Sequence, residues 1–135
     1  MLKYKNRGPI DYSLCNQVVT VFHADLKAGT ITQTVINKAF FDFRKNENVN
    51  RTGQTETNGF LLVIPSALNG IVSQPVYNGD KVLLGTMTLP KITTPAEASA
   101  AWNDLIPSKV ANLTVVKYVD PKYWGGVIAH WEAGG

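Results

Sequence analysis

Cysteine is almost absent from this chain. Cys15 is the only one, so no disulfide can form within the molecule, and the composition fits a reducing compartment. Long apolar runs are missing as well: none approaches the ~20 residues that span a bilayer, and the N-terminus lacks the apolar stretch of a signal peptide. We therefore expect a soluble intracellular protein without a membrane partner.

An excess of charge of one sign is also missing. Thirteen basic and ten acidic residues leave a net charge of +3, whereas neutralising nucleic-acid phosphates usually takes a clustered basic surface. The densest basic run is "MLKYKNR" at the start, with Lys3, Lys5 and Arg7. We interpret it as part of a solvated N-terminal arm, residues 1–16, and keep a binding patch as the alternative.

Patterns typical of metal sites and activated nucleophiles are lacking. His23 and His130 fall near the ends of expected strands, without the Cys/His/Asp spacing of a metal site. Cys15 has no adjacent motif that would activate it, so we interpret it as a small apolar filler. No serine lies in a G-x-S-x-G elbow, and "SALNG" is expected to be a loop.

Acid–base and phosphate-binding patterns are lacking too. No spacing forces a pair of carboxylates together, and those that could act are expected in turns or on strand surfaces: Asp42, Glu47, Glu56 and Asp80. The "NGD" and "WGG" runs indicate turns, because no glycine-rich loop opens onto a helix. We expect a protein that is not an enzyme, with no catalytic residues, metal or cofactor.

What the chain does have is a series of short strands. At 135 residues and 14.8 kDa it is expected to be one domain. Strands are predicted at 18–22, 30–36, 39–43, 60–65, in "KVLL", at 112–119 and at 127–133. Turns are predicted at residues 27–30, 78–80 and 121–126. With no βαβ rhythm, the pattern favours a mainly β protein, a small antiparallel sheet closed into a barrel.

One segment has the features of a helix. In "TTPAEASAAWNDLIP", Thr94 is a candidate N-cap, Pro95 takes the first helical position, and Glu97 follows the cap by three residues. Four alanines favour the helix, and Ala98 and Trp102 share a face with Leu105 or Ile106. We predict one short helix within an insertion at residues 86–107.

The aromatic residues are crowded near the C-terminus. Tyr118, Tyr123, Trp124 and Trp131 belong to the predicted last hairpin. Residues of this kind more often form core contacts and cross-strand pairs. Exposed on a small barrel, they could instead stack single-stranded bases, although only Lys117 and Lys122 lie between them.

The segment between Phe43 and Phe60 is conspicuously polar. Its sixteen residues include one aliphatic side chain, Val49. Fixing sixteen backbones costs about 15 to 30 kcal/mol, while one buried valine contributes about 1.5 to 3 kcal/mol. The segment therefore cannot order itself against its own domain, and loops beyond about 12–15 residues are usually functional or disordered.

Two conformations of this segment fit the sequence. It is either a mobile loop or a long hairpin with "RTGQT" at its tip and Gly53 in the turn. Both protrude, which suits an assembly better than a pocket. We predict an interaction loop made of Arg44, Lys45, Asn46, Glu47, Asn48, Val49, Asn50, Arg51, Thr52, Gly53, Gln54, Thr55, Glu56, Thr57 and Asn58.

The quoted runs together resemble a known family. The "VTVFH" strand, the "TVINKAFF" strand, the "VNRTGQTE" loop, "FLLVIP", "GDKV" and the closing "KYVDPKYWGGVIAHWEAGG" are similar to stopper, or head-completion, proteins of long-tailed bacteriophages and prophages of Gram-positive bacteria. Such proteins are also described as minor capsid or head–tail connector proteins. The similarity covers most of residues 18–135, and the 86–107 insertion is larger than in the simplest members.

This resemblance implies a structural role in the virion. It implies a β-barrel that forms a homo-oligomeric ring, a hexamer, in the neck between the portal-bound adaptor and the tail-terminator proteins. The loop at residues 44–58 would face the lumen and help to retain packaged double-stranded DNA without sequence specificity. The protein would be made in the cytoplasm of the bacterial host. The alternatives are a tail-completion, terminator or minor capsid protein, or a single-stranded nucleic-acid-binding barrel.

Overall fold

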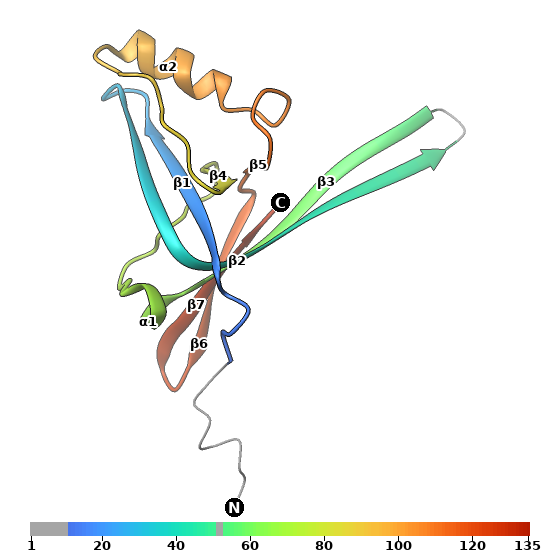
Figure 1. Ribbon diagram of the computed structural model, residues 1–135, viewed down its shortest axis with the longest axis vertical. Coiled ribbons are helices and arrows are strands. Elements are labelled where there is room, and N and C mark those ends of the chain that lie inside the picture. The colour runs from blue at the N-terminus through green and yellow to red at the C-terminus, as the bar shows by residue number, and fades with distance from the viewer. Residues whose placement is uncertain (1–10, 51–52) are drawn as a thin grey trace, which may run out of the picture.

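The computed structural model describes residues 11–50 and 53–135, without the side chains of residues 44–58. Its strands and helices are shown in Figure 1. In chain order they are β1 (Gln17–Asp25), β2 (Thr30–Asn50), β3 (Gly53–Pro65), α1 (Ser66–Asn69), β4 (Lys81–Leu84), α2 (Pro95–Asp104), β5 (Leu113–Val115), β6 (Tyr118–Trp124) and β7 (Val127–Gly134).

The strands of the described residues form one seven-stranded antiparallel sheet, in the order β5-β4-β1-β2-β3-β7-β6. The expectation of a mainly β, antiparallel protein is confirmed. The long strand β2 belongs to both parts of the sheet: residues 30–39 pair with β1, and residues 40–50 pair with β3. This single strand therefore connects the two halves of the molecule.

A β-bulge marks the point where β2 changes partner. Gln17 of β1 pairs with Ala39 and Val19 pairs with Ile36, so Asn37 and Lys38 together oppose the single residue between Gln17 and Val19. An extra residue bends a strand and increases its twist. The sequence pattern placed a break at Asn37-Lys38, whereas the chain continues there as one strand with a bulge.

Closure of the sheet into a barrel is not confirmed. The strand order ends at β5 and β6, and no ladder joins them among the described residues. Val116 and Lys117 connect β5 to β6 and cross from one half to the other. The Val116 N–H donates to the Asp80 carbonyl (2.8 Å), and the Lys117 N–H donates to the Gly134 carbonyl (2.8 Å). The predicted single strand 112–119 is therefore two strands in different halves.

The core lies between the two halves. Buried side chains of one cluster come from both of them: Val19, Val21, Ile36, Ala39, Phe41, Phe60, Leu62, Ile64, Val76, Val82, Val116 and Ala133. In β2, the rings of Phe41 and Phe43 stack on one face, as the period-2 pattern predicted. Phe41 is buried, whereas Phe43 is partly exposed. Burial of these apolar groups is the main stabilising contribution.

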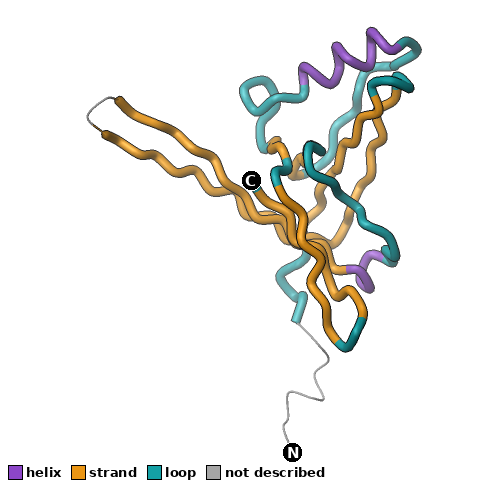
Figure 2. The backbone as a smooth tube through the Cα atoms, turned by 180° about the vertical axis from the view of Figure 1, so that it is seen from behind, coloured by secondary structure: helices purple, strands orange, loops and turns teal. Residues whose placement is uncertain are grey.

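The insertion covers a second, smaller cluster. Phe22, Leu83, Leu105 and Leu113 are buried there, with Met87 and Leu89 packed against them. The predicted helix is α2, and its cap is confirmed: the Glu97 N–H donates to the Thr94 hydroxyl, and the Thr93 N–H donates to the Glu97 carboxylate. Helix α2 stands at one end of the molecule (Figures 1 and 2).

Two predicted turns contain glycines in the left-handed region. Gly29 joins β1 to β2 with φ 73°, and Gly79 precedes β4 with φ 92°. The last hairpin is also confirmed, but its turn consists of Gly125 and Gly126, while Pro121 lies within β6. The expectation that "SALNG" is only a loop is wrong: Ser66–Asn69 forms the single helical turn α1.

Candidate functional site

The backbone of the predicted interaction loop is a β-hairpin. Strands β2 and β3 pair without a break from Phe40 opposite Val63 to Asn50 opposite Gly53. Gly53 thus begins β3 instead of lying at the tip, and Arg51 and Thr52 lie outside the described residues. We call residues 44–58 the ribbon.

The ribbon projects away from the body of the molecule (Figures 1 and 2). Strand β7 pairs with β3 only from Leu61 onward, and β1 pairs with β2 only up to Ala39. Beyond these points each described ribbon strand has one partner, the other ribbon strand. The protruding hairpin predicted from the sequence is therefore present.

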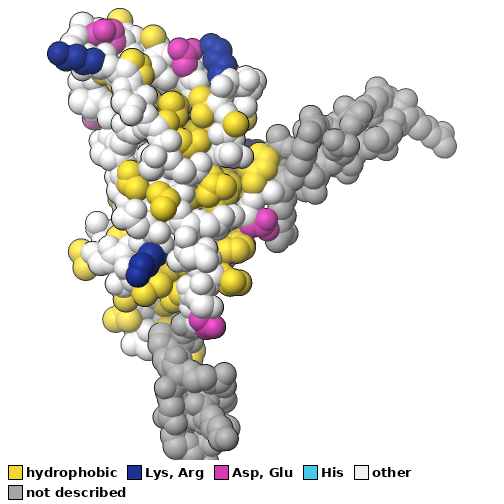
Figure 3. Space-filling view, viewed as in Figure 1, with side chains coloured by type: hydrophobic (Ala, Val, Ile, Leu, Met, Phe, Trp, Pro, Cys, Tyr) yellow, Lys and Arg dark blue, Asp and Glu magenta, His cyan; other side chains and the backbone are white. Residues whose placement is uncertain are grey.

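The ribbon is attached to the body through aromatic side chains at its base. Phe41 stacks with Phe60 (ring centroids 5.8 Å apart) and with Phe43 (6.3 Å), each at an interplanar angle of 17°. The Phe60 N–H donates to the Gly135 carbonyl at 3.2 Å. Figure 3 shows apolar side chains gathered on the body where the ribbon leaves it.

A small cavity lies at the same place. It has a volume of about 210 Å³, and its lining consists of Phe43, Phe60, Pro107, Leu113, Thr114, Val115, Lys117 and Gly135. Phe43 and Val115 remain more than a third exposed. An apolar surface of this kind, continuous with a projecting hairpin, can contact another polypeptide.

The side chains of the predicted interaction residues, Arg44 to Asn58, lie outside the described part of the structure. The sequence still fixes their chemistry: three are basic, two are acidic, and the others are polar apart from Val49 and Gly53. Because the strand period is two, neighbouring residues alternate between the faces of the ribbon. Both faces are therefore largely hydrophilic.

Both histidines lie within hydrogen-bond distance of other side chains. His23 Nδ1 lies 2.5 Å from a carboxylate oxygen of the buried Asp80. His130 is buried, with Nδ1 2.5 Å from the Tyr12 hydroxyl and Nε2 3.2 Å from Glu132. Neither partner of His130 was predicted. The Tyr12 contact depends on how the chain packs, whereas Glu132 lies two residues along β7, so the strand period places it on the same face.

Burial shifts the pKa of three other groups. Burial raises the pKa of the Cys15 thiol, as expected for an inert apolar filler. It also raises the pKa of Tyr12 and lowers that of Lys81. The Lys81 ammonium donates to the Trp102 carbonyl at 2.6 Å and lies 4.3 Å from the centroid of the Trp102 ring.

Among the described residues, no group of three or more His, Cys, Asp or Glu side chains could hold a metal ion. In the same part of the chain, no helix is long and apolar enough to cross a bilayer.

The aromatic residues of the last hairpin separate into two environments. Tyr118, Tyr123 and Trp124 of β6 are exposed, whereas Trp131 of β7 is buried. Trp131 is a core residue and cannot stack on a ligand. The alternative that Trp131 stacks bases together with the three aromatic residues of β6 is therefore wrong for Trp131.

The chain was compared with known proteins in three ways. A scan against protein-family models found no match, and searches of curated proteins and of solved structures found none either. The resemblance described above stays a prediction.

Proposed function

We propose that this protein is a structural component of a bacteriophage neck, a stopper that forms a ring between the portal-bound adaptor and the tail. The observation that carries the proposal is the ribbon, a polar two-stranded hairpin that leaves the body at the stacked pair Phe41 and Phe60. The resemblance of the sequence to head-completion proteins adds the place in the virion.

The energetics of the ribbon favour an assembly. An isolated two-stranded hairpin is at best marginally stable in water, and its unpaired edges are templates for another chain. Residues 44–58 contribute almost no apolar surface that could anchor them to the body. Neighbouring copies in a ring would supply the missing contacts and place the ribbons beside a hydrated channel.

The composition of the ribbon fits a lumen through which DNA passes. Arg44, Lys45 and Arg51 are accompanied by Glu47 and Glu56, so residues 44–58 have a small positive balance. Such a surface can lie beside phosphates without the clustered charge that would hold DNA permanently. The hexameric ring, the retention of packaged DNA and the location in the virion neck all belong to this proposal.

Assembly on purified rings tests the function. The protein is mixed with portal and adaptor proteins from the same genome, and the products are followed by native mass spectrometry and negative-stain microscopy. We expect an additional ring below the adaptor. If none forms, the stopper function is rejected, and recovery of the protein from isolated tails but not from filled heads would establish a tail role instead.

A matched variant tests the contribution of the ribbon. Residues 46–57 are replaced by Asn-Gly, which joins the paired residues Lys45 and Asn58 through a two-residue hairpin turn and keeps the register of the two strands. The body should keep its circular dichroism and thermal transition, while assembly on the adaptor ring is weakened or DNA leaks from filled heads. A variant that assembles and retains DNA like the parent would contradict a role for the ribbon.

A second candidate function is single-strand nucleic-acid binding through β6. It is favoured by the exposure of Tyr123 (63%) and Trp124 (49%), because exposed aromatic rings can stack on bases. The measurement is fluorescence anisotropy with labelled oligothymidine at several salt concentrations. Affinity that falls steeply with salt and is lost in Trp124→Ala would support it; binding no stronger than that of an unrelated basic protein would remove it.

A further inference from the structure

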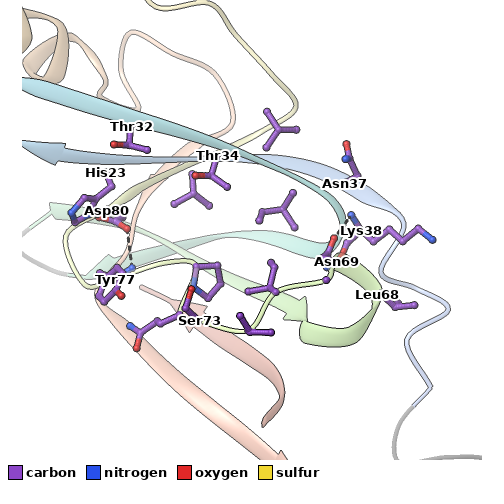
Figure 4. Close-up of a pocket in the computed structure, with 18 residues that line it drawn as sticks. His23, Thr32, Thr34, Asn37, Lys38, Leu68, Asn69, Ser73, Tyr77 and Asp80 are labelled. Carbon is purple, nitrogen blue, oxygen red and sulfur yellow. Dashed lines mark hydrogen bonds and ion pairs between the residues drawn. The ribbon is translucent and has the colours of Figure 1, made fainter.

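A cavity of about 710 Å³ lies on the opposite side of β2 from the insertion. One wall is a face of the β1–β2 pair, with Val21 and His23 from β1 and Thr32 and Thr34 from β2. The other wall is the segment 68–77 together with Asp80. Figure 4 shows the Thr32 and Thr34 side chains between β2 and this segment. We call this cavity the groove.

The groove runs along an unpaired strand edge. Residues 30–39 of β2 pair with β1 only, and among the described residues no backbone hydrogen bond reaches the outer edge of residues 31–37. In an antiparallel strand every second residue directs its N–H and C=O away from the partner strand. Consecutive residues from Thr34 to Lys38 line the groove, so it follows the edge and not only one face.

A side-chain amide already takes the place of a neighbouring strand at one end of this edge. The Lys38 N–H donates to Asn69 Oδ1 at 3.2 Å, and Asn69 Nδ2 donates to the Lys38 carbonyl at 2.9 Å. Asn69 is itself held by a hydrogen bond from Nδ2 to the Pro65 carbonyl at 2.8 Å. At this point β2 therefore makes the pair of hydrogen bonds that a peptide group would offer.

The rim of the groove is unusually apolar for a surface. Val35 (47%), Leu68 (46%), Val72 (98%) and Tyr77 (48%) are exposed, and all four line it. Four exposed apolar side chains around one cavity are typical of an interaction site, whereas single exposed apolar side chains are common on any surface. They lie on both sides of the edge, where alternate side chains of an added strand would reach them.

The charges of the groove indicate the sign of its partner. The buried carboxylate of Asp80 is already bonded to His23 and to the Tyr77 N–H at 2.8 Å (Figure 4). The remaining charged group of the lining is the exposed Lys38, at the end that Asn69 occupies. A carboxylate on the partner would complement this ammonium.

We propose that the groove binds an extended segment of a partner protein, which pairs with residues 31–37 of β2, packs alternate apolar side chains against the rim and places a carboxylate beside Lys38. Strand addition of this kind takes affinity from main-chain hydrogen bonds and specificity from alternate side chains. The site is separate from the ribbon and does not depend on the proposed function.

A peptide library tests the site directly. The probe is a set of fluorescent, N-acetylated and C-amidated heptapeptides with Val, Ile, Leu or Tyr at alternate positions and Ser or Thr between them. Each has Asp at its first or its last position, so that both strand directions are covered. We expect members that bind with dissociation constants below about 1 mM, about −4 kcal/mol or better, and that protect amides of residues 31–37 from hydrogen exchange. If no member binds, the proposal is overturned.

Matched variants separate specific from general binding. Val72→Asp should weaken the best peptide at least tenfold, whereas Val127→Asp, equally a surface valine but outside the groove, should not. N-methylation of the alternate peptide amides that face β2 should abolish binding, whereas N-methylation of the other alternate set should have little effect. Binding that survives Val72→Asp, or that survives N-methylation of both alternate sets, contradicts strand addition.

The contact between Lys38 and the carboxylate of the partner is tested by changing one group in the protein and one in the peptide. Lys38→Gln should weaken binding of the best peptide with a terminal Asp several-fold and leave binding of the corresponding Asn peptide unchanged. Equal losses for both peptides would overturn the carboxylate contact. Concentration-dependent dimerisation of the protein alone that Val72→Asp removes would show that a second copy is the occupant, which would overturn the choice of a different partner protein.

Discussion

Phe60 stacks on Phe41 at the base of the ribbon, with ring centroids 5.8 Å apart and planes 17° from parallel. The two rings are diagonal neighbours in the β2–β3 ladder, because Phe60 pairs with Phe43 and Phe41 pairs with Leu62. Both are buried in the main core cluster. This contact attaches the ribbon to the body.

We expect Phe60→Ala to lower the free energy of unfolding by about 3–5 kcal/mol, because it removes a buried ring and leaves a cavity. Urea denaturation followed by circular dichroism measures the change. Phe43→Ala is the matched control: this residue is 38% exposed and should cost much less. Equal losses of unfolding free energy in the two variants would contradict the special contribution of the buried Phe60 ring.

The tryptophans of the last hairpin should respond very differently to truncation. Trp131 is 3% exposed and pairs with Ile64 of β3, so Trp131→Ala should destabilise the protein by about 3–5 kcal/mol. Trp124→Ala, at a half-exposed position, should leave the thermal transition nearly unchanged. Thermal unfolding of both variants checks this, and a stable Trp131→Ala protein would contradict the core role.

Gly29 should tolerate a side chain less well than Gly79. Both have positive φ, which costs an L-residue about 1–2 kcal/mol. A Cβ on Gly29 would also lie 3.0 Å from Pro95 at the start of α2, whereas one on Gly79 meets nothing within 4 Å. Gly29→Ala should therefore cost more than Gly79→Ala in chemical denaturation, and the reverse order would show that the contact with α2 is not close.

The start of α2 should depend on pH through Glu97. Hydrogen bonds from Thr93 hold the pKa of the Glu97 carboxyl below its usual value. Its contribution is therefore fully present above pH about 4.3 and is lost as the pH falls through the lowered pKa of the folded state. We expect the Thr93 and Glu97 amide signals to move with one titration in NMR spectra.

Glu97→Gln is the control for this titration. A glutamine can keep the capping hydrogen bonds but does not ionise, so the helix should persist at low pH and the titration should disappear from the amide signals. If the signals of Thr93 still titrate in Glu97→Gln, another group controls the start of the helix.

The sequence by itself determined the elements that depend on local chemistry. The β-branched run at residues 18–22 placed β1, and the apolar run at residues 60–65 placed the inner part of β3. Turn-forming residues placed the turns at Gly29 and Gly79, and Thr94 with Glu97 placed the start of α2. Each of these follows from steric limits and hydrogen bonds within a few residues. The shortage of apolar side chains after Phe43 likewise predicted that the ribbon would project.

Tertiary structure alone decided which edges meet. The bulge at Asn37 and Lys38, the break of residues 112–119 into two strands and the unclosed strand order depend on partners far away in the chain. The groove has the same origin, because Asn69 and segment 68–77 contact β2 across a long separation in the sequence. A pattern with a period of two shows which residues share a face, but the choice of neighbouring strand is made by packing across the core.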